Sequence, residues 1–327
     1  MNEQFRVAQK LGLMFRPETH LPNDVKNWAI SQLKAKSPAL GISQIGSKVK
    51  PWPQSLQPDL MARDTMFGNW FQRGKIGDAS NFSLAERNAN DKENLMRDKD
   101  ELKFSHRNVY GRDQVRLRFT AFWTNHFTTG NTHDNINHIG HAIDEAILAN
   151  LNGDFSHMLY KMTSHPSMLI YLDNIYSAGP NSNAVEWSKS KGEQAGLNDN
   201  LGRELLELHT VSPSAKYTED DIRNAAKVLA GWGVFPGMLW GNNKITLKQK
   251  HAKLIQMAGT TNTWDFFKPR HAEPGTKTIM GKVITANSRQ ELKGGLRNLT
   301  DFLKVDRVVV LTCVVSAFHG HGYSALF

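Results

Sequence analysis

The chain has 327 residues, of which 39% are apolar and 22% are charged. This balance excludes an intrinsically disordered protein, because disordered chains combine low hydrophobicity with high net charge. The length is enough for one large domain or two modest ones, because single hydrophobic cores stop growing at roughly 250–300 residues. The 40 basic and 31 acidic residues give a net charge of +9.

The cysteine count and the apolar pattern limit the kinds of site and the compartment. Cys313 is the single cysteine, which excludes an intramolecular disulfide and a cysteine-built zinc site. The first residues lack the basic segment and the apolar run of about 7–15 residues that define a signal peptide. No run reaches the roughly 18–20 apolar residues that a membrane helix requires. As written, the chain is expected to be cytoplasmic, without a membrane span.

Residues 1–110 are expected to form an N-terminal helical and irregular arm. Apolar residues recur at helical spacing over 22–34, behind a proline suited to a first helical turn. Four prolines scattered over 36–62 predict irregular structure. The highly charged segment 83–104 opens with a capping-box pattern at Ser83 and Glu86, which predicts an exposed helix.

Residues 111–303 have the strongest helical periodicity and are expected to form a helical core. Polar residues over 177–196 predict an inserted loop, and short apolar pieces at 237–241 and 279–284 predict a small strand pair. The predicted fold class is therefore mainly α, an irregular multi-helix domain with a small β-hairpin or loop element after the central helices. The predicted helices lie at about 112–127, 136–151, 155–173 with a break at His165-Pro166, 198–210, 218–231 and 292–303.

Residues 304–327 form an atypical tail. Val308–Val315 are mostly apolar and uncharged, and a segment rich in glycine and histidine follows them. The abrupt change after Leu303 predicts a frameshift or truncation that has replaced a closing helix. We expect this loss to leave an apolar face of the 292–303 helix partly uncovered.

Five spaced blocks of the sequence, in order, match the motifs of one known family. Together they cover roughly residues 110–300, and on them the chain resembles the bacterial family catalogued as domain of unknown function 1800. The blocks are Arg116–Phe127 with the letters FWTNHF, Ser164–Asp173, Asn200–Thr210, Tyr217–Trp232, and His271 with Gly275–Gly281.

The resemblance implies little about activity, because that family has no established reaction. Its members tend to be larger, are often exported, and are often encoded beside a protein similar to the alkaline-phosphatase and sulfatase superfamily. This chain departs from the family pattern at Ala272, where an acid usually follows the histidine, and Glu273 comes next instead. It departs again after Leu303, where the family continues with a further helix.

The helix predicted at 198–210 carries the first group of candidate site residues. At 100° per residue, Asn200, Arg203, Glu204 and Glu207 lie in one polar stripe about 100° wide. Two carboxylates one turn apart beside an arginine could act as an acid–base pair or bind a cation. The alternative is a structural ion pair between Arg203 and Glu207, at i and i+4, that supports a packing site.

His126 lies in the aromatic stripe of the 112–127 helix and is therefore expected to be buried. A buried histidine needs a hydrogen-bond partner, for which a carboxylate is the natural group. We expect His126 to face the polar stripe of the 198–210 helix, with Asn125 beside it as a ligand-binding candidate. The alternative is a satisfied core histidine. His209 lies on the far side of its helix from the two carboxylates, so we expect it to make a separate contact, with the Lys277 loop.

His138, His141 and Glu145 have a spacing that could hold a metal. Apolar residues occupy the opposite face of this predicted helix, which makes the histidine side an ordinary solvent face. No metal site is predicted here or elsewhere in the chain.

Residues 275–278 read Gly-Thr-Lys-Thr and have a partial likeness to a phosphate-binding loop. The second glycine that such a loop needs is missing, since position 270 is an arginine. Lys277 beside His271 could still hold an oxyanion. The residues identify no cofactor.

The leading hypothesis is a binding or accessory module that acts with a separately encoded enzyme, for which the resemblance suggests a sulfatase- or phosphatase-like protein. In it, His126, Glu204 and Glu207 form a structural or ligand-holding centre. The alternative is a hydrolase-like enzyme with Glu204 or Glu207 as general base, in which basic residues of 244–297 bind an anionic substrate. Nucleic-acid binding is disfavoured, because no basic–aromatic motif accompanies the positive charge.

Overall fold

The structure is a computed structural model that describes residues 23–34, 52–53, 56–60, 62–63, 84–111, 113–130, 135, 137–211, 215–234, 264 and 266–304. Helices hold 62% of these residues, and a small two-stranded antiparallel hairpin follows the central helices. The predicted fold class is therefore confirmed. Within the described part, none of the helices is long and apolar enough to cross a membrane.

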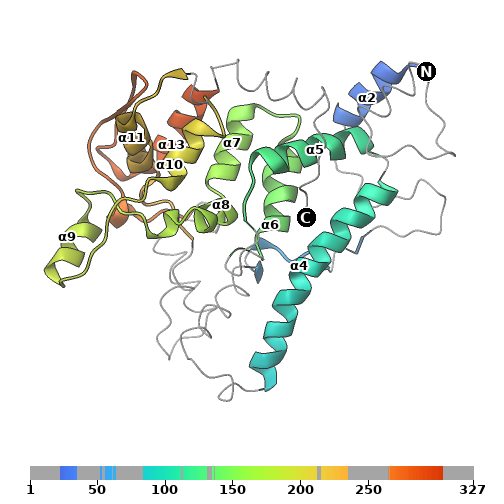
Figure 1. Ribbon diagram of the computed structural model, residues 1–327, viewed down its shortest axis with the longest axis horizontal. Helices are drawn as coiled ribbons and strands as arrows, with labels where there is room; N and C mark the ends of the chain where they lie inside the picture. Colours follow the sequence, from blue (N-terminus) through green and yellow to red (C-terminus); the bar gives the residue numbers. More distant parts are fainter. Residues whose placement is uncertain are drawn as a thin grey trace.

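Three helices lie on one side of the molecule, as the right-hand half of Figure 1 shows. They are α2 (Val25–Lys34), α4 (Leu84–Tyr110) and α5 (Gln114–His126). The helices predicted at 22–34 and 112–127 are confirmed, and the one predicted at 83–104 continues to Tyr110. Helix α2 packs against α5, where the amide of Val115 donates to the side-chain oxygen of Gln32 over 2.9 Å.

The helix predicted at 136–151 is divided into three short pieces. These are α6 (Ile139–His141), the π-helical turn η3 (Ala142–Ile147) and the 3-10 turn η4 (Leu148–Asn150). Ala142, Ala146 and Ile147 in the π-helical turn are buried, so this side of the turn faces the core. Single π-helical turns inside helices are uncommon and often occur at functional sites.

The break predicted at His165-Pro166 separates α7 (Phe155–Thr163) from α8 (Pro166–Tyr171). Proline is tolerated in a first helical turn, because the amide it lacks has no partner there. Residues 177–196 were predicted to be a loop, but they contain helix α9 (Asn183–Ser190), which begins after the N-cap Ser182. The turn η5 (Asn174–Tyr176) precedes it.

Helices α10 (Asn200–Glu207) and α11 (Glu219–Leu229) pack closely against each other. Gly202 makes this approach possible, because a Cβ atom at that position would lie 2.7 Å from the backbone nitrogen of Ala226. Thr218 and Asp221 form the capping box that begins α11, as the sequence pattern at Thr218 suggests.

Helix α13 (Arg289–Leu303) lies against α7 and α11. Its apolar row is covered, since Leu296, Leu299 and Leu303 are all buried. The expectation of a partly uncovered face on this helix is therefore wrong for the leucine row. Among the described elements, α7 and α11 contribute to this cover.

The hairpin consists of β1 (Lys277–Ile279) and β2 (Lys282–Ile284), with Thr278 opposite Val283. Met280 and Gly281 connect the strands with φ values of 48° and 81°. Two consecutive positive φ angles are typical of the tight turns that match the twist of a hairpin. Ahead of the hairpin lies the 3-10 turn η9 (Pro269–His271).

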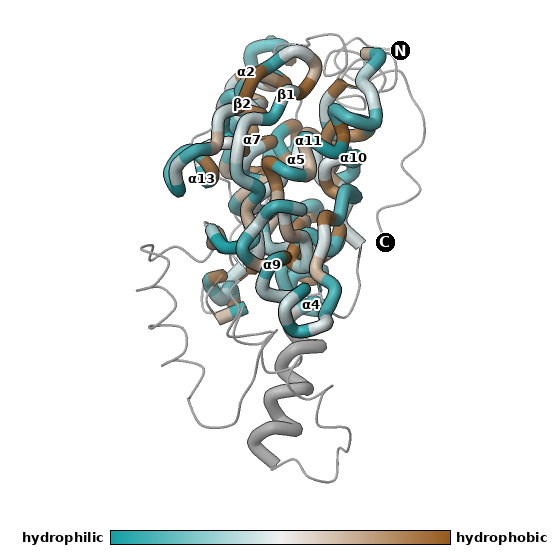
Figure 2. The backbone as a smooth tube through the Cα atoms, turned by 90° about the vertical axis from the view of Figure 1, so that its left-hand side faces the viewer, coloured by the Kyte–Doolittle hydropathy of each residue, from teal (hydrophilic) through white to brown (hydrophobic). Residues whose placement is uncertain are grey.

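Most of the described apolar residues belong to one hydrophobic core that extends from Leu60 to Leu303. In Figure 2 the apolar segments gather where the helices meet, whereas α9 carries mostly polar residues. Trp232 is fully buried in this core, and its ring packs edge to face on that of Tyr160. The side-chain amide of Asn174 donates to the carbonyls of Leu229 and Trp232, which ties the end of α11 to η5.

Several expectations concern residues outside the described part of the chain. They are the capping residue Ser83, most of the irregular arm at 36–62, the apolar piece at 237–241, and the tail after Lys304.

Candidate functional site

Arg203 is the centre of a charged cluster between α10 and α11. Its guanidinium donates two hydrogen bonds to the carboxylate of Glu219, of 3.0 and 2.8 Å. It also lies 3.3 Å from Glu207 and 3.5 Å from Asp199. The predicted Arg203–Glu207 pair is therefore confirmed. The hydrogen bond with Glu219 raises the pKa of Arg203, and the same bond lowers the pKa of Glu219.

Glu204 occupies a different environment one residue further along α10. Its side chain is half-buried, and partial burial and the charge of Glu207 raise its pKa above the ordinary value. Among the described residues, its carboxylate has no hydrogen-bond or ion-pair partner. Asn200 is exposed at the start of the same helix. The polar stripe of α10 thus contains one heavily paired arginine and one unpaired carboxylate.

His126 lies in the aromatic cluster of α5, where its ring contacts those of Phe122, Trp123 and Phe127. Its Nε2–H donates to the backbone carbonyl of His209 over 3.0 Å. The partner is a backbone carbonyl, so the expectation of a carboxylate partner is wrong. Burial lowers the pKa of His126. A neutral ring fits this bond, because one nitrogen of a neutral imidazole still carries a proton.

His209 follows the end of α10 and is buried against α5. Its amide donates to the carbonyl of Glu204 over 2.9 Å, and its ring contacts those of His126 and Phe127. Burial lowers the pKa of His209 to about 3. The interactions of His209 within the described residues are thus with α10 and α5. The expected contact with the Lys277 loop is not among them.

The structure therefore divides the candidate residues near α10 into two groups. His126 meets His209, whereas Glu207 meets Arg203. No hydrogen bond or ion pair within the described residues joins His126 to Glu204 or Glu207. Asn125 is exposed at the end of α5, next to His126. The two groups are connected through the backbone at the end of α10.

The segment from His271 to Lys277 forms a tied turn before the hairpin. The Nζ of Lys277 donates to the carbonyls of Glu273 and Gly275. The carboxylate of Glu273 accepts from the amide and the side-chain nitrogen of Asn181, over 2.8 and 2.6 Å. The acid displaced by one position from the family pattern thus anchors this turn to the segment before α9.

Burial changes the acid–base properties of the same turn. It lowers the pKa of Lys277 to about 8, and it lowers the pKa of His271 to about 4 with the help of Lys268 and Arg270. Lys277 is 3% exposed, so it is not part of a solvated basic surface.

The histidines of α6 lie inside the molecule. His138 is fully buried, and burial lowers the pKa of His141 to about 3. The expectation that His138 and His141 mark a solvent face is therefore wrong, although Glu145 is exposed. The helix breaks into a π-helical turn after His141.

His141 belongs to a hydrogen-bonded chain that sequence reasoning missed. The amide of Ser167 donates to Nδ1 of His165 over 3.0 Å, so a neutral His165 carries its proton on Nε2. That Nε2 lies 3.0 Å from Nδ1 of His141, which therefore accepts. The ring of Trp264 packs edge-on against both histidines. The sequence signal was His165-Pro166, which was interpreted as a helix break alone.

A buried ion network near α4 was also missed. The guanidinium of Arg63 makes a two-pronged contact with Asp100, over 2.7 and 2.9 Å, and donates to the carbonyl of Asn137. Lys103 pairs with Asp144 of the π-helical turn. Charged residues far apart in sequence gave no local pattern from which these pairs could be inferred.

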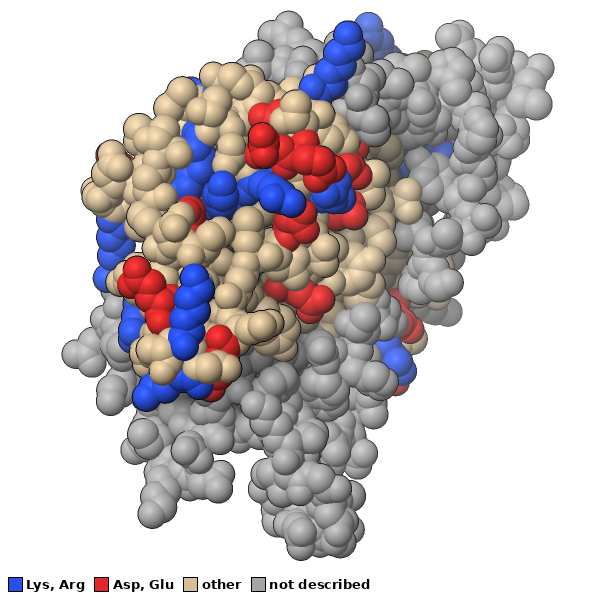
Figure 3. All heavy atoms as spheres, turned by 60° about the vertical axis from the view of Figure 1, so that its left-hand side comes forward, with Lys and Arg blue, Asp and Glu red and all other residues tan. Residues whose placement is uncertain are grey.

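Figure 3 shows acidic and basic side chains intermixed on the face that includes α10 and α11. Within the described part of the chain, no group of three or more histidine, cysteine, aspartate and glutamate side chains is arranged to hold a metal ion. Most of the described charged side chains near α10 are paired, and the histidines beside them are hydrogen-bonded.

Comparison with curated proteins and with solved structures finds no significant match. Comparison with protein families matches residues 8–309 to the family described as "Protein of unknown function (DUF1800)". This match extends well beyond the five motif blocks and includes most of the N-terminal arm. The chain belongs to the DUF1800 family.

Proposed function

We propose that the chain is a binding or accessory module that acts with a separately encoded enzyme. The observation that carries this proposal is the pairing of Arg203 with Glu219, Glu207 and Asp199. A catalytic acid–base centre needs groups that converge on an open pocket with a place for the reacting atom. In the described structure, the arginine instead joins two helices, and His126 is bound to a backbone carbonyl.

The surface around Arg203 supports a binding role. Asp199, Glu207 and Glu219 surround it, and Glu204 lies beside them, so four carboxylates accompany this guanidinium. The exposed side chain of Leu208 adjoins the cluster in sequence. Four carboxylates against Arg203 and the nearby Arg223 leave the cluster with a net negative charge, which attracts a partner that presents basic side chains. The family resemblance suggests a sulfatase- or phosphatase-like protein as that partner.

Calorimetric titration of the purified chain with that enzyme tests the proposal. We expect saturable binding that weakens between 50 and about 300 mM salt, because surface charges are screened. Glu219→Gln should weaken binding about threefold or more, since it removes one carboxylate from the cluster.

Glu186→Gln is the matched control, because Glu186 is also an exposed glutamate in the first turn of a helix, α9. It should leave the affinity unchanged within about twofold. Absence of saturable binding at tens of micromolar, together with an unchanged kcat/KM of the enzyme, would contradict the proposal.

A hydrolase-like enzyme is the second candidate, and one observation favours it. Glu204 has a raised pKa and no ion-pair partner among the described residues. A carboxyl group whose pKa lies nearer to neutral is suited to general acid–base catalysis. In this alternative, Glu204→Gln abolishes the activity.

A further inference from the structure

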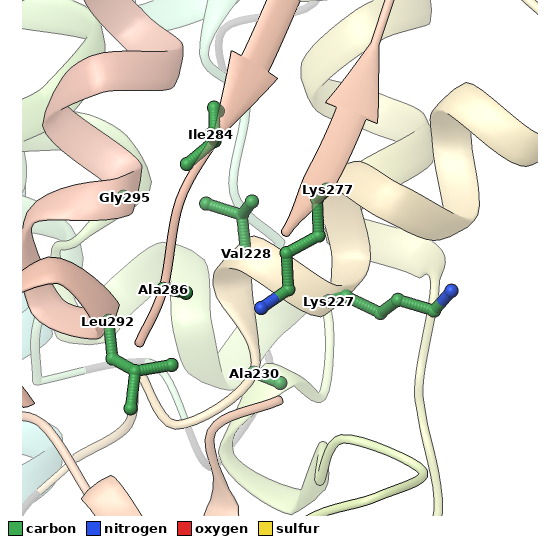
Figure 4. A pocket seen from close by; sticks show the side chains of 8 residues that line it. All are labelled: Lys227, Val228, Ala230, Lys277, Ile284, Ala286, Leu292 and Gly295. Carbon is green, nitrogen blue, oxygen red and sulfur yellow. The ribbon is translucent and has the colours of Figure 1, made fainter. Parts of the chain in front are cut away.

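The pocket beside the hairpin, between α11 and α13, is too small for an organic ligand. Its interior has room for about one water molecule. Figure 4 shows that the amine of Lys277 points into it, whereas that of Lys227 points away. The other lining residues are uncharged, and they are Val228, Ala230, Ile284, Ala286, Leu292 and Gly295. This pocket is therefore a gap in the packing between three elements.

The turn between η4 and α7, by contrast, is open to solvent. Asn152, Gly153 and Asp154 are all exposed. Apart from its chain neighbours, a Cβ atom built on Gly153 would meet a single atom within 4 Å, the carbonyl oxygen of Asn150. The sequence here is the only Asn-Gly pair among the 327 residues. Within the described structure, this pair therefore lies in open space.

The turn is anchored at both ends by side chains that pack on the core. Leu151 and Phe155 are both partly buried against the hydrophobic core. Between them, the amide of Gly153 donates to the carbonyl of Asn150 over 3.0 Å. Because Gly153 is exposed, water can replace this hydrogen bond when the turn opens locally. The peptide between Asn152 and Gly153 can then move while the two core contacts remain.

We propose that Asn152 is a self-modification site, at which the side-chain amide is converted to a carboxylate through a cyclic imide. The backbone nitrogen of Gly153 loses its proton to solvent and forms a bond to Cγ of Asn152. The C–N bond of the side-chain amide breaks, and its nitrogen leaves as ammonia. Water then opens the ring at either carbonyl, which gives aspartate or isoaspartate. The balance is R–CO–NH₂ + H₂O → R–COO⁻ + NH₄⁺, with no change of oxidation state.

Glycine at position 153 favours ring closure for a steric reason. It has no Cβ atom beside the attacking nitrogen, so the imide ring can form without a clash. The φ angle of Gly153 is not in the left-handed region, so the folded turn does not itself require glycine. A Cβ atom there would make an ordinary contact of 3.4 Å with the carbonyl oxygen of Asn150. Gly153→Ala should therefore fold normally and hinder the reaction.

The product changes both the charge and the length of the chain at this turn. The new carboxylate at position 152 lies close in sequence to that of Asp154, and both side chains are at the surface, where water weakens their repulsion. Negative charge near the N-terminus of a helix is also favourable, so α7 tolerates it. An isoaspartyl link adds one carbon atom to the backbone between the anchors Leu151 and Phe155. The modified molecules therefore keep α7 and differ at a surface turn.

Mass spectrometry after ageing of the whole protein tests the proposal. The protein is kept at pH 8 and then digested in mild acid, and the conversion of each asparagine to aspartate or isoaspartate is measured. Asn287 is the internal control, because it is also exposed ahead of a helix, but the amide of the following Ser288 is held by Glu291. We expect the converted fraction at Asn152 to be at least about tenfold above that at Asn287, because glycine leaves the attacking nitrogen accessible. Equal conversion of the two asparagines would overturn the proposal.

Two further measurements separate this chemistry from general ageing of the chain. Gly153→Ala should lower the rate at Asn152 about tenfold or more, with an unchanged melting temperature. In concentrated urea the wild-type rate should rise by less than about tenfold, because the folded turn already opens easily. An equal rate in Gly153→Ala and the wild type, or a rise of more than about 100-fold in urea, would contradict a reactive open turn.

Discussion

The free energy of unfolding should fall by at least about 6 kcal/mol when the pH is lowered from 7.5 to 5. His141, His165 and His209 are held neutral, because burial lowers the pKa of each well below its ordinary value. In the unfolded chain they take up protons below about pH 6.5. The unfolded state therefore binds more protons between pH 6.5 and the folded pKa of about 3, and stability is lost as pH falls.

The size of this effect follows from the same difference in proton binding. Each histidine contributes about 2 kcal/mol at pH 5, when its folded pKa is far below that pH. The total is comparable with the whole stability of a typical domain, about 5–15 kcal/mol. Burial also lowers the pKa of His271 to about 4, which adds to the loss of stability. The raised pKa of Glu204 acts in the opposite direction, but this side chain is only half-buried.

Urea denaturation followed by circular dichroism at pH 7.5, 6 and 5 measures this dependence. His209→Leu removes one titrating ring and keeps an apolar side chain beside Phe127. This variant should lose about 2 kcal/mol less than the wild type over the same pH interval. A wild-type stability that differs by less than about 1 kcal/mol between pH 7.5 and 5 would show that these histidines are not held neutral.

Asp100→Asn is expected to lower the free energy of unfolding by about 3–5 kcal/mol, because it leaves the buried guanidinium of Arg63 without its carboxylate. The side chains of Arg63 and Asp100 are 2% and 11% exposed. Lys103 also lies 3.6 Å from Asp100, but it keeps its ion pair with Asp144. Denaturant unfolding at pH 7.5 gives the difference in stability.

The matched control lies on the same helix. Arg97 and Asp98 form an ion pair of 3.2 Å whose side chains are 41% and 51% exposed. Asp98→Asn should change the stability by less than about 1 kcal/mol, because an exposed pair contributes little. Similar losses for the two variants would mean that the Arg63–Asp100 pair is not buried as described.

The helices with a continuous apolar face could be predicted from the sequence, since periodicity determines which side of a helix is buried. Helix α11 is an example, with Thr218 as its cap and a buried row that includes Ile222 and Leu229. Helix α9 has eight residues with few apolar side chains, so its pattern does not differ from that of a polar loop. The π-helical turn in η3 depends on tertiary packing around Ala146, for which periodicity gives no signal.

The candidate site was predictable where its interactions are local. The Arg203–Glu207 pair follows from i,i+4 spacing, and it is present. The partner of Arg203 with the shortest contact, Glu219, lies on another helix and could not be inferred from spacing. In the same way, the bond between His126 and His209 joins the ends of two helices. Such contacts depend on how helices pack, which a single sequence does not specify.

The most direct test of the α10 residues as a binding centre is a hydrolase screen that compares the wild-type protein with Glu204→Gln. Phosphate and sulfate esters, carboxylic esters and peptides are each supplied at saturating concentration, and the melting temperature of both proteins is measured as a control for folding. The account predicts no hydrolysis above the uncatalysed rate by either protein. Hydrolysis of any of these substrates by the wild type, reduced about 100-fold or more in a folded Glu204→Gln variant, would contradict it and establish Glu204 as a catalytic residue.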